Sequence, residues 1–336
     1  MKRGESRRLR TGSPAHWLTA QRVGFLVLPD PLPDPLIDPC SALARQDSGA
    51  AFVRLAIPSF NSLSFVHPVL LQVGPLLVPS YGACAALGVL LALGLAQWTS
   101  RRTGLNPRHA WNMIVLAVFA SLAVSRLVLI ALNLSDLRRH PSWLLAVAMV
   151  HHPLLAAVGI VSGAAAVMIY ARWMNLPLAA VADCLAAPVS VGMAAEQVGA
   201  LLAGSDFGRE SASNSLLGAV TYSNELAARW SGTPLEVPLY PVQAYAALGA
   251  LLLAAIVFAW LYLPRRDGDV AGIWLGGAGV LLFLTEIFRD WEGRGVVFDE
   301  LVDIPQLVGL GMVLLGGAVL WDWRRGSAMA EKVHNA

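Results

Sequence analysis

The sequence predicts an all-α membrane protein, a bundle of seven transmembrane helices with a small extracytoplasmic (periplasmic) head insertion. Of the 336 residues, 56% are hydrophobic and 14% are charged, whereas a soluble domain carries roughly 25% charged residues. Seven apolar stretches are each long enough to cross a bilayer, and one long polar connection separates two of them. The net charge is only +2 and no basic stripe is present, which argues against a nucleic-acid partner.

The seven apolar stretches define the helices of the predicted bundle. A helix needs about 20 apolar residues to cross the hydrocarbon core. Small residues are frequent in several stretches, as in Gly159–Ala166, and they let helix backbones approach closely in lipid. We therefore expect a compact bundle. The stretches run approximately over 78–98, 111–133, 153–172, 178–202, 240–263, 271–289 and 304–323.

Arginine and lysine in the connections predict the orientation of the bundle. Cytoplasmic loops carry an excess of these cations, and the alternate connections hold nine in one set and six in the other. The richer set is therefore predicted to be cytoplasmic, with the front of the first helix outside and the tail 327–336 inside. The richer set is Arg101, Arg102, Arg108, Arg172, Arg265, Arg266, Arg324, Arg325 and Lys332, and the poorer set is Arg138, Arg139, Arg209, Arg229, Arg289 and Arg294.

The longest connection between helices, about 204–239, lies on the outer side in this orientation. It is polar, with acidic residues such as Asp206 and Glu236, and Gly218–Tyr222 is compatible with a short strand. A loop of this length is usually either functional or disordered. It forms the expected head insertion.

Residues 1–65 differ from the rest of the chain. They are basic and Pro-rich, but they contain no apolar run long enough for the core of a signal peptide. A basic segment here also conflicts with placing the front of the first helix outside. We expect either a disordered leader or a translation start at Val66 that leaves this segment out of the natural protein. The membrane domain is expected to span 66–326.

Ionisable residues inside the apolar stretches are the first candidates for a functional site. Each costs about 2.5–3.5 kcal/mol at the bilayer centre, so each is functional by default. They are Arg126, Asp183, Glu196, Glu286 and Arg289. The Arg126 guanidinium suits either a phosphodiester or a buried ion pair with Glu286 or Glu196. Glu286 and Arg289 share a helix face, as either a surface ion pair or half of a headgroup site.

Few other residues indicate chemistry. His151 and His152 precede the third helix, and histidine can serve as a base near neutral pH, although loop histidines are most often simply solvated. Tyr81, at the start of the first helix, fits an interfacial aromatic belt. The three cysteines lack Cys-x-x-Cys spacing, and no G-x-S-x-G, H-E-x-x-H or P-loop motif is present. We therefore expect no metal site, no disulfide framework and no cofactor.

Six short motifs occur in one collinear series along residues 66–326. They are Val66–Pro75 followed by Tyr81-Gly82, then Arg126, 197–209, 239–245, Glu286–Arg289 and Gln306. The series resembles prolipoprotein diacylglyceryl transferases. Chains of that family have Met-His-Pro and Tyr-Gly near the start, an arginine in the second helix, and a signature with Arg-x-Gly-x-Phe and a closing Gly-Arg. These motifs are followed along the chain by His-Pro-x-Gln-Leu-Tyr-Glu, by Glu-Phe-Phe-Arg and by a Gly-Gln in the last helix.

This resemblance implies a function and a set of site residues. Enzymes of the family transfer the diacylglyceryl group of phosphatidylglycerol to the lipobox cysteine of preprolipoproteins, forming a thioether and releasing glycerol phosphate. They work in the bacterial inner (plasma) membrane, among its lipids. Catalytic roles are implied for His151, His152, Tyr81 and Glu286. Substrate-binding roles are implied for Arg126, Gln197, Gly208, Gln243 and Arg289.

The chain also departs from the family pattern. Gln197 stands where the signature has a phosphate-binding arginine, Tyr240 replaces the histidine of His-Pro-x-Gln, and Leu282 replaces a sixth-helix arginine. Losing one oriented donor opposite a developing charge lowers the rate about 100-fold or more. The alternative is therefore a catalytically impaired paralogue that binds an anionic lipid headgroup or a membrane partner. An unrelated transporter or channel is disfavoured, because the sequence shows no internal hydropathy repeat.

Overall fold

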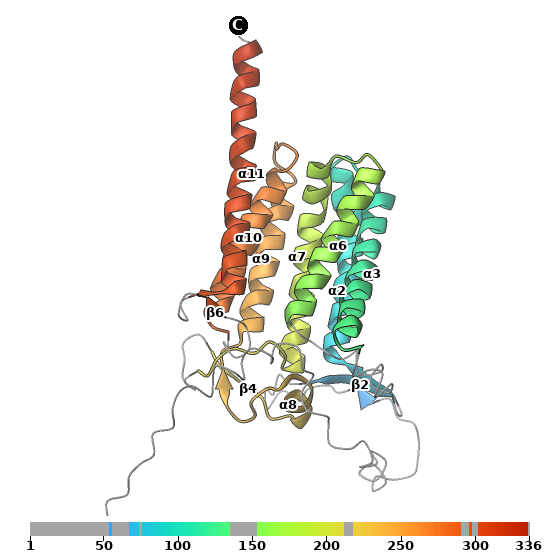
Figure 1. The fold of residues 1–336 in the computed structure, drawn as a ribbon, viewed down its shortest axis with the longest axis vertical. Coiled ribbons are helices and arrows are strands. Elements are labelled where there is room, and N and C mark those ends of the chain that lie inside the picture. Colours follow the sequence, from blue (N-terminus) through green and yellow to red (C-terminus); the bar gives the residue numbers. More distant parts are fainter. Residues whose placement is uncertain are drawn as a thin grey trace, which may run out of the picture.

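The computed structural model describes residues 54–55, 67–73, 76–134, 153–211, 218–289, 296–297 and 302–334. Within these ranges, seven helices are long and apolar enough to cross a membrane (Figure 1), which confirms the predicted all-α, seven-helix membrane fold. They are α2 (Ser80–Arg102), α3 (Pro107–Leu132), α6 (Pro153–Trp173), α7 (Leu178–Ala203), α9 (Val242–Trp260), α10 (Asp269–Glu286) and α11 (Ile304–His334), whose apolar span is Ile304–Trp321.

The ends of two helices differ from the prediction for a visible reason. The α9 helix begins at Val242, two residues later than expected, because Tyr240 pairs with the loop after α7: its N–H donates to Arg209 O at 3.1 Å. The α10 helix ends at Glu286, three residues early, because the chain turns there and Phe288 O accepts from Arg209 N at 3.0 Å. Both ends are therefore set by the same loop.

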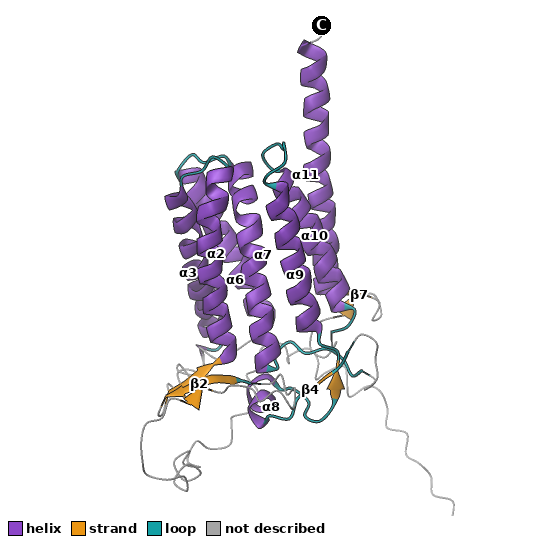
Figure 2. Cartoon of the chain, turned by 180° about the vertical axis from the view of Figure 1, so that it is seen from behind, coloured by secondary structure: helices purple, strands orange, loops and turns teal. Residues whose placement is uncertain are grey.

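Short strands and one short helix lie together at one end of the bundle, which we call the head end (Figures 1 and 2). The short strand expected in the outer loop is present as β4. β1 falls within 1–65, and the rest of that segment lies outside the described residues. The head end contains the antiparallel sheet β1 (Arg54–Leu55), β2 (Val69–Val73) and β3 (Leu76–Pro79), the pairs β4 (Val220–Thr221) with β5 (Pro238–Leu239) and β6 (Val296–Val297) with β7 (Val302–Asp303), and α8 (Glu225–Ser231).

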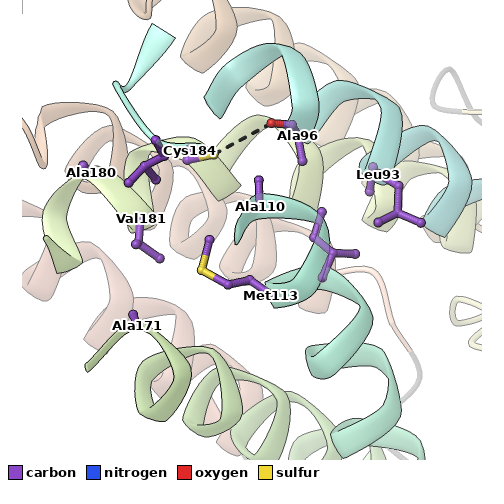
Figure 3. Close-up of a cluster of buried hydrophobic side chains, with 11 residues drawn as sticks. Leu93, Ala96, Ala110, Met113, Ala171, Ala180, Val181 and Cys184 are labelled. Atoms are coloured by element: carbon purple, nitrogen blue, oxygen red, sulfur yellow. Dashed lines mark hydrogen bonds between the residues drawn. The ribbon is translucent and has the colours of Figure 1, made fainter. Parts of the chain in front are cut away.

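Small side chains hold the bundle together around α7, which packs against α2 and α9 and also touches α3, α6 and α10. A Cβ at Gly88 of α2 would lie 2.9 Å from Ala195 Cβ on α7, so only glycine permits this approach. A buried cluster joins α2, α3, α6 and α7, and the dashed line in Figure 3 marks the contact of Cys184 Sγ with Ala96 O. Next to this cluster, Thr99 Oγ1 donates to Cys184 O at 2.8 Å. The cluster includes Leu93, Ala96, Ala110, Met113, Ala171, Ala180, Val181 and Cys184.

The outer surface of the bundle is apolar, as a membrane protein requires. Leu90, Ile160 and Leu248 are 64%, 72% and 67% exposed on three different helices. Figures 1 and 2 show α2, α3, α6 and α7 on one side and α9, α10 and α11 on the other, with α7 beside α9. Exposed aliphatic side chains on every side suit contact with lipid tails.

Two charged side chains fix helix ends at the end of the bundle opposite the head. Asp183 is fully buried, and its carboxylate accepts from Gly268 N at 2.7 Å and from Ala271 N at 2.8 Å. These donors belong to the first turn of α10, whose N–H groups have no partner within the helix. Arg265 likewise donates to Leu261 O and Arg102 O. Asp183, expected to be functional because it is ionisable, therefore caps a helix.

Candidate functional site

The remaining ionisable residues of the spans gather at the head end. Tyr81 is the second residue of α2, Arg126 lies six residues before the end of α3, and Glu196 lies in the last third of α7. Glu286 is the last residue of α10, and Arg289 follows it in the turn. Because α2 begins at the head end while α3, α7 and α10 finish there, the alternating chain direction brings all five residues to one level.

A hydrogen-bonded pair between α2 and α7 forms the centre of this group. The Tyr81 hydroxyl donates to Glu196 Oε1 at 2.9 Å, and Gln197 Nε2 donates to Glu196 Oε2 at 2.6 Å. The charges of Arg126 and Asp206 act on the Tyr81 hydroxyl, and the charges of Asp206 and Arg289 act on Glu196. The two arginines therefore lie within electrostatic range of one Tyr81–Glu196 pair, one on each side of the bundle.

Arg289 and Glu286 form a buried ion pair. Arg289 Nη1 lies 3.3 Å from Glu286 Oε1, and their side chains are 13% and 1% exposed. The surface ion pair considered from the sequence is thus wrong, because a surface pair would be solvated on both partners. Arg289 Nε is buried without a hydrogen-bond partner. Since buried donors are normally satisfied, this N–H is suited to an oxygen of a ligand or of a water molecule.

Gly208 sets the position of Arg289 through the backbone. It forms an isolated antiparallel bridge with Arg289. A Cβ at this position would lie 2.5 Å from Tyr240 O and 2.9 Å from Phe288 O. The loop after α7 thus threads between the start of α9 and the end of α10, where only glycine fits. Gly208, predicted to bind substrate, has a visible role in shaping the backbone around the arginine.

Gln243 is fully enclosed by protein groups. Its Nε2 donates to Ser205 O at 2.7 Å and reaches the Tyr222 hydroxyl at 3.5 Å. Burial raises the pKa of Tyr222 to about 12, although the Gln243 hydrogen bond partly opposes this effect. Gln243 therefore links α9 to the loop after α7 and to the head. Its predicted substrate-binding role stays a prediction.

Buried polar atoms without partners are concentrated at the head end. Among the described residues there are six such side-chain atoms, and five belong to head-end residues; the sixth, Arg265 Nε, lies at the opposite end. Native structures leave few buried polar groups unsatisfied. This concentration indicates a polar ligand site among apolar helices. The five atoms are His67 Nε2, Gln197 Oε1, Ser205 Oγ, Gln243 Oε1 and Arg289 Nε.

The chain is similar to known proteins along most of its length. A family model described as prolipoprotein diacylglyceryl transferase matches residues 68–322. The chain belongs to the prolipoprotein diacylglyceryl transferase family. It is 30% identical over 272 residues to a phosphatidylglycerol–prolipoprotein diacylglyceryl transferase of Methylibium petroleiphilum, covering 76% of this chain and 95% of the relative. Similarly named proteins of Vibrio cholerae and Clostridium tetani are 28% and 24% identical, covering 78% and 75% of this chain and 93% and 95% of theirs.

Some of the predicted site residues can be placed in the structure and others cannot. In the structure, Tyr81 and Gln197 hydrogen-bond to Glu196. The charge of Arg289 acts on Glu196, and the charge of Arg126 acts on Tyr81. His151 and His152 lie outside the described residues. In the part of the chain that the structure does describe, no group of three or more His, Cys, Asp or Glu side chains is placed to hold a metal ion.

Sequence reasoning assigned no site role to the two acidic residues whose charges act on the Tyr81 hydroxyl. Glu196 was one of the ionisable candidates and a possible partner of Arg126, whereas it accepts from Tyr81, 115 residues away in the chain. Asp206 was noted only as part of a polar loop, yet its charge acts on both Tyr81 and Glu196. The available signal was a glutamate inside an apolar span, directly before the glutamine that replaces the signature arginine.

Proposed function

We propose that this protein transfers the diacylglyceryl group of phosphatidylglycerol to the lipobox cysteine of preprolipoproteins. The thiol sulfur attacks the terminal glycerol carbon of the diacylglyceryl group, a thioether forms, and the carbon–oxygen bond to phosphate breaks. Glycerol phosphate leaves with the electron pair. The protein's task is to bind the phosphodiester, orient the thiol and stabilise the charge that develops on the leaving phosphate.

The observation that carries this proposal is the convergence of Arg126 and Arg289 on the Tyr81–Glu196 pair. A guanidinium forms charge-assisted, bidentate hydrogen bonds with phosphate oxygens. Arg289 is held by Glu286 at 3.3 Å and retains a buried Nε–H without a partner. Arg126 is partly buried, and its charge reaches Tyr81 from α3. Two cations whose charges act on the same Tyr81–Glu196 pair, one on α3 and one just after α10, suit a single phosphate between them.

A reconstituted transfer assay tests the proposal. Purified protein in vesicles containing phosphatidylglycerol receives a lipobox peptide, and mass spectrometry measures the diacylglyceryl adduct while glycerol phosphate is quantified separately. We expect adduct and glycerol phosphate in equal amounts, and no adduct with a Cys→Ser peptide. Arg126→Ala should lower the rate about 100-fold or more. Arg101→Ala is the matched control, because Arg101 is exposed at the opposite end of the bundle.

Lipid binding without transfer would contradict this function. A well-folded wild-type protein that binds phosphatidylglycerol but forms no adduct would be the impaired paralogue instead. Equal loss for Arg126→Ala and Arg101→Ala would show that the head-end cation has no special role.

We further propose that the protein lies in the bacterial inner membrane with its head end outside and its C-terminus in the cytoplasm. Arg101, Arg172 and Arg265 lie at the end opposite the head, in keeping with the excess of cations in cytoplasmic loops. Labelling of single introduced cysteines with an impermeant maleimide tests this orientation. Glu236→Cys should react in intact spheroplasts, whereas Arg266→Cys should react only after permeabilisation. The reverse pattern would overturn the assignment.

A further inference from the structure

We infer that Tyr81 and Glu196 form a proton relay that takes up the proton of the acceptor thiol. This inference rests on the proposed function and adds to it the group that activates the nucleophile. Tyr81 is the residue that meets the thiol, and Glu196 is the final proton acceptor behind it. A thiol attacks as its thiolate, so a group that removes its proton at the site contributes directly to the rate.

The direction of the hydrogen bond suits such a relay. The Tyr81 hydroxyl donates its own proton to Glu196 Oε1 at 2.9 Å. A phenolic oxygen that donates its own proton can also accept one from another group. A thiol that donates to this oxygen would pass its proton to Tyr81 while Tyr81 passes its proton to Glu196.

Close packing of α2 on α7 holds the pair in register. Gly199 lies one turn after Glu196 on α7, and a Cβ there would lie 3.2 Å from Tyr81 Cα and 2.8 Å from Cys84 Cβ. The backbones can approach this closely only because position 199 is glycine. The distance between the tyrosine hydroxyl and the carboxylate is therefore set by helix packing rather than by loops.

Glu196 is distinguished from the other two carboxylates of the cluster by its partners. Glu286 is ion-paired with Arg289 at 3.3 Å, and Asp206 is exposed to solvent. Glu196 is partly buried, and its two hydrogen-bond donors, Tyr81 and Gln197, are both neutral. Of the described charges, Asp206 and Arg289 act on Glu196 from a distance. A carboxylate with neutral donors keeps the capacity to accept a proton that a tight ion pair would remove.

The proposed step balances without a further reactant. The thiol proton moves to the Tyr81 oxygen, and the Tyr81 proton moves to Glu196 Oε1. The sulfur forms a bond to the terminal glycerol carbon, and the bond from that carbon to the phosphate oxygen breaks. The phosphate oxygen, bound between Arg126 and Arg289, leaves with the electron pair of the broken bond. Glu196 later releases its proton to water.

A peptide whose nucleophile is already ionised distinguishes a proton-relay role of Tyr81 and Glu196 from a purely structural role. The transfer assay compares a lipobox peptide containing cysteine with one containing selenocysteine, because a selenol is a stronger acid and is ionised at neutral pH. For Glu196→Gln and Tyr81→Phe we expect a rate about 100-fold lower with the cysteine peptide. Most of that loss should disappear with the selenocysteine peptide. Arg126→Ala should lose rate equally with both peptides, because phosphate binding does not depend on the nucleophile.

The pH dependence gives a second measurement. Raising the pH toward the ordinary thiol pKa of about 8.5 should bring the two relay variants closer to wild type with the cysteine peptide. Unchanged rates, or equal losses with both peptides in variants that still bind phosphatidylglycerol, would overturn the relay. If the selenocysteine peptide restored the transfer rate only in a His151→Asn or His152→Asn variant, the group that takes the thiol proton would be a histidine instead. Failure of wild type with both peptides would instead refute the transferase function, and the relay with it.

Discussion

Replacing Gly208 by alanine tests whether the loop after α7 positions the arginine of the site. The added Cβ would lie 2.5 Å from Tyr240 O and 2.9 Å from Phe288 O. Carbon–oxygen contacts in proteins are normally about 3.3 Å or longer, so one backbone segment must move by about 0.8 Å. Neither neighbour is a flexible side chain that could move aside at little cost.

The displacement should reach Arg289 because backbone hydrogen bonds join the loop that contains Gly208 to the segment that contains Arg289. Arg209 N donates to Phe288 O at 3.0 Å and Tyr240 N donates to Arg209 O at 3.1 Å, so the loop, α9 and the end of α10 move together. Overpacking of this kind typically lowers the free energy of unfolding by about 1–3 kcal/mol. A misplacement of about 1 Å in a positioning group can lower the rate about 100-fold. We expect Gly208→Ala to show both effects.

The assay measures initial rates of peptide modification together with thermal unfolding in detergent. Gly276→Ala is the matched control, since a Cβ at Gly276 of α10 meets nothing within 4 Å. Helix propensity then favours alanine, so the control should keep the wild-type rate and unfold no earlier than wild type. Wild-type rate and stability in Gly208→Ala would refute the steric reasoning. Reduced stability with an unchanged rate would refute the coupling to Arg289.

Three further predictions follow from individual contacts. Asp183→Ala should lower the free energy of unfolding by about 1–3 kcal/mol, because it leaves two buried N–H groups of α10 unpaired. The folded variant should keep the wild-type transfer rate. The control Asp269→Ala removes an exposed hydrogen bond and should lower the free energy of unfolding by less. The Tyr222 pKa is raised from 10.0 to about 12 on folding, so the folded state holds this proton more tightly. Its stability contribution is therefore complete below pH 10 and is lost between about pH 10 and 12; unfolding midpoints of wild type should fall more steeply in this window than those of Tyr222→Phe. Gln197→Arg, although it restores the family's arginine, should not raise the transfer rate, because a guanidinium beside Glu196 would tie up the proposed proton acceptor; a clear increase would contradict the relay.

The bundle was predictable because its signal is local and redundant. Each span is a run of about 20 apolar residues, and α7 (Leu178–Ala203) differs from the predicted 178–202 by one residue. Pro188 inside this helix does not end it, since transmembrane helices tolerate proline. Two of the helix ends that differ from the prediction, at Val242 and Glu286, are fixed by the loop around Gly208. That loop contacts them only in the folded chain, so no local pattern reports it.

Several members of the candidate site were predictable from the sequence, but its contacts between helices were not. Arg126, Glu286 and Arg289 stand out because a charge inside an apolar span is costly unless something compensates it. The pairing of Glu286 with Arg289 follows from their spacing on one helix face. The pairing of Tyr81 with Glu196 joins two helices across 115 residues, and it depends on how deeply α2 sits against α7. Glycines such as Gly199 set that depth through tertiary contacts.

Two carboxylates on α7 show why residue type alone cannot assign a role. Asp183 and Glu196 are both ionisable, both lie in the same apolar helix, and both accept two hydrogen bonds. The donors of Asp183 are backbone N–H groups at a helix start, which cannot give up their protons, so this carboxylate stabilises the fold. The donors of Glu196 are a tyrosine hydroxyl and an amide, and the hydroxyl can pass its proton on and accept another. The kind of donor, rather than the carboxylate, therefore separates the structural acid from the one suited to chemistry.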